Sequence, residues 1–297
     1  MPVDGLHPFT AMTRDEAGYG VAREELPDAP LSEDDGLKAK GYYSSRIIKA
    51  GALLADTMTL LDNWDQSLSV ADNLGRLQSQ NLFGKASRSR VRDVLAIFRQ
   101  RYLRDEGLTR ALAFLVKNHF PKPALDRVLY YHSAAADTLL HDTVTEVLAK
   151  LYFRGRTEIS VEDIERPLRE WVREGKTSAR WSQYTTLRVA RGLLATLRDF
   201  GVLQGAGKKR IAPPTLPVSA FCYIAFDLHR AQASGERLVH SSEWELFFLS
   251  TSEVEQHFIE AHQRSLLEYY AAGPVVRITF PCESLEDYAR VIAERAV

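Results

Sequence analysis

Two clusters of arginine and lysine are the residues of this 297-residue chain whose types and spacing could do chemistry. Between Arg173 and Arg210, nine basic residues stand against two acidic ones, a net charge of +7. The stretch from Lys85 to Arg104 has seven basic residues and one aspartate, a net charge of +6. Cationic side chains gathered on one surface attract phosphate, so both clusters predict contact with a polyanion.

The positive charge is local, because the whole chain has 38 basic and 39 acidic residues. Residues 1–37 contain nine acidic residues and two arginines, and few large apolar ones. This composition predicts a disordered acidic tail. Residues 236–297 are acidic again, with 11 acidic residues against five arginines. Basic clusters between acidic ends indicate a localised binding surface.

The first cluster coincides with a long helix that the sequence predicts from about Thr177 to Phe200. Apolar side chains occupy an arc of about 100° on that helix, as a packing face requires. A separate arc of about 80° is basic. Its members are Arg180, Arg188, Arg191 and Arg198.

The elements around this helix follow the order of a winged helix-turn-helix. Ser160 begins an S-x-x-D capping pattern before a helix that ends near Val172. Residues 201–204 and 210–212 predict two strands joined by a tip at 205–209. In a winged helix the long helix enters the major groove and the wing contacts the flanking backbone. The predicted DNA-binding residues are therefore Lys176, Arg180, Ser182, Gln183, Tyr184, Arg188, Arg191, Lys208, Lys209 and Arg210.

The second basic cluster is a weaker candidate. It flanks the apolar stripe of a helix predicted to begin after Ser87. Arginines beside a buried stripe often only carry their charge out to solvent. This possible second patch comprises Lys85, Arg88, Arg90 and Arg92. The alternative for both clusters is an ordinary solvated helix face.

Catalytic and metal-binding patterns are missing from the sequence. The run Gly205-Ala206-Gly207-Lys208-Lys209 lacks the first glycine and the Ser or Thr of a Walker A motif. The eight histidines and two cysteines have no metal-ligand spacing. Glu174-Gly175-Lys176 matches only the end of a nuclease pattern. We expect no enzymatic activity, no metal, no cofactor and no small-molecule substrate.

Helical periodicity from about residue 42 onward predicts a mainly α fold, whose first helix spans about Tyr43 to Leu61. The predicted parts are an acidic tail (1–37), a helical bundle (38–136), a winged helix-turn-helix-like unit (137–215) and a C-terminal α+β segment with a β-hairpin (216–297). The longest apolar run is the seven residues from Ala220 to Phe226, too short to span a bilayer. Because no secretory pattern begins the chain, we expect a cytoplasmic protein without membrane contact.

Several structural stretches resemble the BrxA family, which is encoded in BREX (bacteriophage exclusion) defence clusters. They are Tyr43-Ser44-Ser45-Arg46 to Trp64, Asn81-Leu82 to Arg92 around Ser87-Arg88-Ser89, Leu193-Leu194 to Gly201-Val202-Leu203, His240-Ser241-Ser242-Glu243-Trp244 to Ser250, and Gly273-Pro274-Val275-Val276-Arg277-Ile278. The likeness covers roughly residues 40–281, so residues 1–39 form an extension. It implies a small, mainly helical, DNA-binding accessory protein. Together with the predicted winged helix, this favours a protein that binds double-stranded DNA. Such a protein would work beside a methyltransferase, an ATPase and a phosphatase-like protein.

Two other functions stay open at this stage. In the first, the acidic C-terminal part and the apolar segment Trp244–Leu249 dock onto other BREX proteins. The chain would then be an assembly factor, and its nucleic-acid binding would be incidental. In the second, the N-terminal bundle binds RNA.

A chain that lacks residues 1–37 should bind duplex DNA more tightly than the full chain. The expected reason is that the acidic tail competes with nucleic acid for the basic clusters. Fluorescence anisotropy with one random duplex measures both affinities. Equal affinity with and without the tail would exclude this competition.

Overall fold

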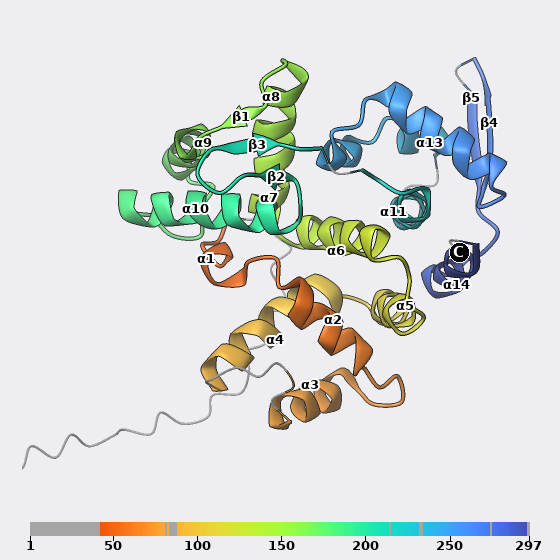
Figure 1. Ribbon diagram of the computed structural model, residues 1–297, viewed down its shortest axis with the longest axis horizontal. Coiled ribbons are helices and arrows are strands. Elements are labelled where there is room, and N and C mark those ends of the chain that lie inside the picture. The colour runs from red at the N-terminus through yellow and green to blue at the C-terminus, as the bar shows by residue number, and fades with distance from the viewer. Residues whose placement is uncertain are drawn as a thin grey trace, which may run out of the picture. The chain divides into compact units, whose positions relative to one another are not determined.

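Helices make up most of the computed structural model, which describes residues 42–80, 82, 88–213, 215–231, 234–273 and 275–295 (Figure 1). The predicted mainly α fold is confirmed, and so is the C-terminal hairpin. Its strands β4 (Glu268–Ala272) and β5 (Val275–Thr279) pair in antiparallel register. The predicted acidic tail lies outside the described residues.

The N-terminal half is helical. Its elements are α1 (Ile47–Ala50), α2 (Leu54–Asp62), α3 (Val70–Ser79), α4 (Arg88–Tyr102), α5 (Glu106–Lys117) and α6 (Lys122–Ala136). The prediction of one helix from Tyr43 to Leu61 is wrong, because Gly51 and Leu53 adopt left-handed backbone angles with φ of 53° and 51°. The buried Arg101 guanidinium donates to the carbonyls of Gly51 (3.0 Å) and Ala52 (3.3 Å), which stabilises this break between α1 and α2.

The middle of the chain surrounds a small sheet. Its elements are α7 (Thr138–Asp142), the π-helical segment η1 (Thr143–Ala149), α8 (Lys150–Phe153), β1 (Glu158–Ile159), α9 (Val161–Arg173), α10 (Gln183–Asp199), β2 (Leu203–Gln204) and β3 (Lys209–Ile211). The strands pair antiparallel in the order β1-β3-β2. Ser160 and Asp163 form the predicted capping box at the start of α9. The sheet closes against the helices through buried Ile159, Leu203 and Ile211.

The long basic helix is shorter than predicted. Helix α10 begins at Gln183, where the Ser182 hydroxyl accepts a hydrogen bond from the backbone N–H of Thr185 (3.1 Å). Residues 176–178 are extended instead of helical because they pair with the backbone of Tyr43. The Tyr43 N–H donates to the Lys176 carbonyl (2.7 Å), and its carbonyl accepts from Ser178 (3.0 Å).

The C-terminal part completes the same core. Its helices are α11 (Val218–Ala231), α12 (Gly235–Val239), the 3-10 segment η2 (Ser242–Phe247), α13 (Thr251–Gln263) and α14 (Leu285–Arg295). Helix α14 packs against α5 and α11, which joins the C-terminal part to the N-terminal bundle. One cluster of buried apolar side chains runs from Tyr43 to Ile292. Within the described ranges, no helix has the length and apolar character needed to cross a membrane.

The apolar segment Trp244–Leu249 is part of this core. The exposed fractions of Trp244, Leu246, Phe247 and Phe248 are at most 2%. The Trp244 ring stacks on Phe221, and its indole N–H donates to the carbonyl of Leu238 (2.7 Å). This segment therefore contributes to folding, and the prediction that it docks onto other proteins is wrong.

Helix α10 is held in place by α9 and by α1, which lies between α10 and α4 (Figure 1). A small residue permits the close approach of α1. A Cβ atom built on Gly192 would lie 3.4 Å from the Ile47 carbonyl oxygen and 3.5 Å from the Ile48 Cα. There is room at this crossing for a methyl group and for little more.

Replacement of Gly192 tests this crossing. Gly192→Leu should lower the free energy of unfolding by about 1–3 kcal/mol, because the larger side chain must displace α1. Gly192→Ala should be neutral or stabilising by up to about 1 kcal/mol, since alanine is the better helix former. Urea denaturation measures both. Equal stability of the two variants would contradict the close packing.

Candidate nucleic-acid interface

The exposed side of α10 combines basic side chains with an aromatic ring. Arg188 and Arg191 are exposed, and Tyr184 is 69% exposed. The Arg188 guanidinium lies over the Tyr184 ring, 5.8 Å from its centroid, in a cation–π contact. On the opposite side Leu193 and Leu197 are fully buried. The helix thus has the apolar face and the basic face that its sequence predicts.

Charge on this surface is only partly neutralised within the protein. In the described part of the chain, Arg180, Arg191 and Lys208 form no ion pair. By contrast, Arg198 is paired with Asp199 at 2.9 Å. Lys176 is likewise paired with Glu174, at 2.8 Å. Exposed cations without an acidic partner keep their full charge for an external anion.

The turn between β2 and β3 forms the tip that the sequence predicts. Gly205 adopts a φ of 93°, and a Cβ atom there would collide with the Lys208 carbonyl, so the turn requires glycine. Lys209 folds back, and its ammonium donates to the carbonyl of Ala206 (3.2 Å). Arg210 lies 3.8 Å from Glu158 across the sheet, with both side chains largely exposed. Lys208 therefore carries the least compensated charge of the turn.

The predicted site residues before α10 have different surroundings. Lys176 and Arg180 both lie in the segment that precedes the helix, so Arg180 does not extend its basic face as predicted. Ser182 caps the helix, which occupies its hydroxyl oxygen. Gln183 is the first helical residue and is exposed. The surface that the structure brings together is thus the exposed side of α10 and the β2–β3 turn, which we call the α10–turn surface.

The second basic cluster divides into structural and exposed arginines. Arg90 donates to the Lys49 carbonyl at 2.8 Å, so α4 uses it to hold α1. Arg101, in the same helix, is buried at the turn after α1. Arg88 and Arg92 are exposed. Lys85 lies outside the described residues.

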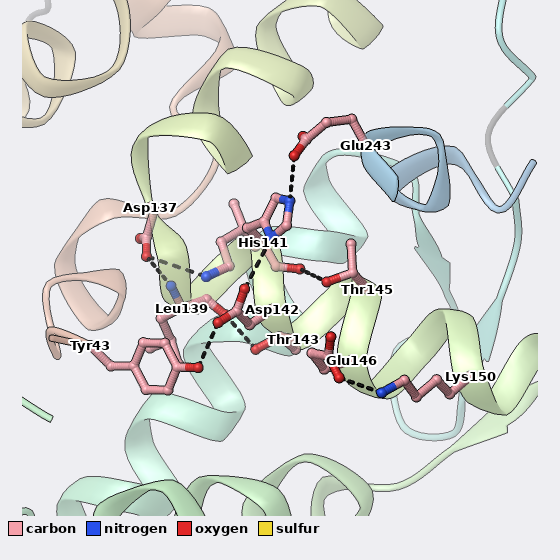
Figure 2. Close-up of polar contacts among 11 residues, drawn as sticks. Tyr43, Asp137, Leu139, His141, Asp142, Thr143, Thr145, Glu146, Lys150 and Glu243 are labelled. Carbon is pink, nitrogen blue, oxygen red and sulfur yellow. Dashed lines mark hydrogen bonds and ion pairs between the residues drawn. The ribbon is translucent and has the colours of Figure 1, made fainter. Parts of the chain in front are cut away.

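A chain of polar contacts that the sequence did not reveal joins three distant parts of the molecule (Figure 2). The Tyr43 hydroxyl donates to Asp142 Oδ2 at 2.6 Å. His141 Nδ1 lies 3.0 Å from Asp142 Oδ1, and its Nε2 lies 3.1 Å from Glu243 Oε1. These contacts connect the segment before α1, the end of α7 and the start of η2.

The two carboxylates hold His141 in its charged form. Hydrogen bonds to Asp142 and Glu243 raise the pKa of His141 to about 10, although burial works in the opposite direction. Burial opposes ionisation of Asp142, but hydrogen bonds from His141 and Tyr43 lower the pKa of Asp142. A histidine that is charged at neutral pH and donates from both ring nitrogens is neither a general base nor a metal ligand. We interpret this chain as a structural connection.

Threonine hydroxyls accompany the change to π-helical backbone after His141 (Figure 2). Thr143 donates to the Leu139 carbonyl at 2.6 Å, and Thr145 donates to the His141 carbonyl at 3.2 Å. Hydroxyls that bond the carbonyl four residues earlier bend helices. Both threonines lie within the first three residues of η1.

A cleft of about 830 Å³ opens beside this polar chain, with Tyr131, Leu228 and Arg237 among its lining residues. Its acidic groups Asp142 and Glu243 already accept hydrogen bonds from His141. In the part of the chain that the structure describes, no group of three or more His, Cys, Asp or Glu side chains is arranged to hold a metal ion.

The fold and these surfaces define a mainly helical protein with exposed basic side chains on one face of α10 and on the β2–β3 turn. Residues 41–227 match the family model named BrxA. The chain belongs to the BrxA family, because this match covers more than half of its length. A comparison with curated proteins gives no match. The stretches at 240–250 and 273–278 that also resemble the family lie beyond the matched residues.

Family membership indicates a component of a BREX phage-defence system and suggests other BREX proteins as its partners. The match contains α1, α4, α10 and the β2–β3 turn. All the predicted site residues therefore lie within the part of the chain that defines the family.

His141 should make stability depend on pH at alkaline values. Its pKa is raised from 6.5 in the unfolded chain to about 10 in the folded protein. Its contribution is therefore complete below pH 6.5, and it is lost as the pH rises through 10. His141→Gln should lack this dependence, so the stability difference between wild type and variant should shrink between pH 6 and pH 10. Urea denaturation at pH 6, 8 and 10 measures it, and a constant difference would refute the charged form.

Proposed function

We propose that this protein is a non-enzymatic accessory component of a BREX system that binds double-stranded DNA through the α10–turn surface. The observation that carries the proposal is the exposed basic face of α10 opposite its buried face. Arg188 and Arg191 lie on that exposed face, and the described residues provide no carboxylate that neutralises Arg191. Phosphate is one of the anions that a guanidinium binds with two parallel hydrogen bonds.

The order of elements supports a helix-in-groove mode of binding. Helices α9 and α10 are followed by the β2–β3 turn, and β1 joins these strands in one sheet. This is the element order of a winged helix-turn-helix, in which the second helix of the motif enters the major groove. Helix α10 has 17 residues, which gives it a length of about 25 Å. That length allows its N-terminal residues to contact bases while Lys208 contacts the flanking backbone.

The same geometry favours DNA over duplex RNA. The major groove of B-form DNA admits an α-helix, whereas the major groove of A-form RNA is too narrow for side chains to read. An exposed helix with Tyr184, Arg188 and Arg191 on one side therefore suits duplex DNA. The RNA alternative places binding in the N-terminal bundle, where the arginines Arg90 and Arg101 already bond backbone carbonyls.

The assembly-factor alternative is weakened by the burial of Trp244–Phe248 in the core. Helix α13 carries acidic residues on its surface, but Glu253 belongs to its own capping box and Glu260 pairs with Arg264. Contacts with other BREX proteins are compatible with DNA binding, because they would use surfaces other than α10.

Charge-removing variants test the α10–turn surface. Binding of a random duplex should weaken steeply with salt, with a slope of log affinity against log salt of about −5 if about six phosphates are contacted. The triple variant Lys208→Ala/Lys209→Ala/Arg210→Ala should make this slope shallower by about 3. The double variant Arg188→Ala/Arg191→Ala should make it shallower by about 2. The triple variant should weaken binding about equally on all sequences, because phosphate contacts carry no sequence information.

Fluorescence anisotropy between 50 and 200 mM salt measures these slopes. The matched control is Arg237→Ala/Arg277→Ala, which removes two exposed arginines from α12 and β5. Its affinity should equal that of the wild type. Salt-insensitive binding, or unchanged affinity in both test variants, would exclude this surface as the DNA contact.

A further inference from the structure

A tyrosine and an arginine one helical turn apart form an exposed pair near the start of α10. Tyr184 and Arg188 are four residues apart, so their side chains are neighbours on the same side of the helix. The Arg188 guanidinium lies 5.8 Å from the centroid of the Tyr184 ring, and that ring is 69% exposed. Among the residues that the structure describes, no carboxylate pairs with Arg188. The Tyr184 ring is therefore the contact that restrains this guanidinium.

This pair occupies the middle of the exposed side of α10. At 100° per residue, Tyr184, Arg188 and Arg191 fall within an arc of about 60°. The fully buried Leu193 lies on the opposite side of the helix. Tyr184 and Arg188 are also the second and sixth of the 17 helical residues, so they belong to its first two turns. In a winged helix, the N-terminal residues of the groove-facing helix are those that contact base edges.

A restrained arginine at this position suits the recognition of guanine. Guanine presents two acceptors, N7 and O6, in the major groove, and a guanidinium donates to both at once. The contact with the Tyr184 ring occupies none of the Arg188 N–H groups in a bond to an oxygen acceptor. Because the ring already limits the rotamers of Arg188, less conformational entropy is lost when the arginine binds a base.

Arg191 differs from Arg188 although both are on the same side of the helix. It lies three residues further along, about 4.5 Å along the helix axis. It is exposed, and the described residues place neither a carboxylate nor an aromatic ring against its guanidinium. An unrestrained cation of this kind suits a phosphate, which accepts hydrogen bonds from many directions and carries no sequence information.

We propose that Arg188, positioned by the Tyr184 ring, recognises a guanine in the major groove, whereas Arg191 binds backbone phosphate. This inference rests on the proposed function and adds a sequence preference to it. The preferred ligand is duplex DNA with a G·C pair at one fixed position of the binding site. Tyr184 is a positioning residue, since it acts through Arg188.

Sequence preference is the property that tests this assignment. Selection from a library of randomised duplexes with the wild-type protein should enrich guanine at one position. Two duplexes are then compared by fluorescence anisotropy, one with the selected G·C pair and one with A·T in its place. The wild type should prefer the G·C duplex by about 5- to 150-fold, the discrimination that one bidentate arginine–guanine pair provides.

Two matched variants separate base recognition from charge. Arg188→Ala and Arg191→Ala each remove one exposed arginine from the same face of α10. Arg188→Ala should bind the G·C and A·T duplexes with nearly equal affinity. Arg191→Ala should keep the wild-type preference for G·C, while its salt slope becomes shallower by about 1. Circular dichroism and the unfolding midpoint establish that each variant is folded.

Two variants of Tyr184 test its positioning role. Tyr184→Phe keeps the ring and should keep the wild-type discrimination. Tyr184→Leu removes the ring and should reduce the discrimination about two- to fivefold, the fold-change that corresponds to an exposed cation–π contact. Neither change alters a charge, so both salt slopes should equal that of the wild type.

The possible failures are distinguishable. If the wild type binds no duplex even at 50 mM salt, the proposed function is wrong. If it binds but the selection enriches no guanine, or if Arg188→Ala discriminates as well as the wild type, the inference is wrong and DNA binding stands. An equal loss of discrimination in Arg191→Ala would also overturn it, because the two arginines would then act alike. Equal discrimination by Tyr184→Leu and Tyr184→Phe would refute the positioning role of the ring.

Discussion

The burial of one side of α10 is the constraint on which the candidate interface depends. Leu193 and Leu197 are fully buried, and each such side chain contributes roughly 1.5–3 kcal/mol of hydrophobic free energy. That face packs toward α9 and the small sheet, while Gly192 lets α1 approach from the side. Because these contacts fix the orientation of α10, the side chains of Arg188 and Arg191 are exposed to solvent. The basic surface is thus a consequence of how the core is closed.

Arginine has two distinct roles in this fold. Arg90 and Arg101 bond backbone carbonyls around α1, where the break after Gly51 leaves acceptors without helical partners. Guanidinium groups suit that task because several N–H donors point in one plane. Arg188 and Arg191 lie on a surface with few carboxylates and stay available. Net charge counted along a helix does not distinguish these two roles, whereas the position of each backbone carbonyl does.

The hydrogen-bonded chain through His141 connects segments that are far apart in the sequence to the start of α10. Tyr43 bonds Asp142 through its hydroxyl and pairs through its backbone with residues 176–178, just before α10. Through His141 the same chain reaches Glu243 in η2. The start of α10 is therefore tied to α7 and to the C-terminal part by hydrogen bonds that include charged partners, which are stronger than neutral ones.

Features that depend on residues close in the chain were predictable from the sequence. The two faces of α10, the Ser160 cap, the Gly205 turn and the C-terminal hairpin all follow from local spacing and from the backbone preferences of a few residue types. Only the tertiary structure decided that α10 begins at Gln183, that Trp244 is core, that His141 meets Glu243 and that α1 lies between the basic clusters. These outcomes depend on which distant surfaces pack together, and the periodicity of a single segment carries no information about its partner.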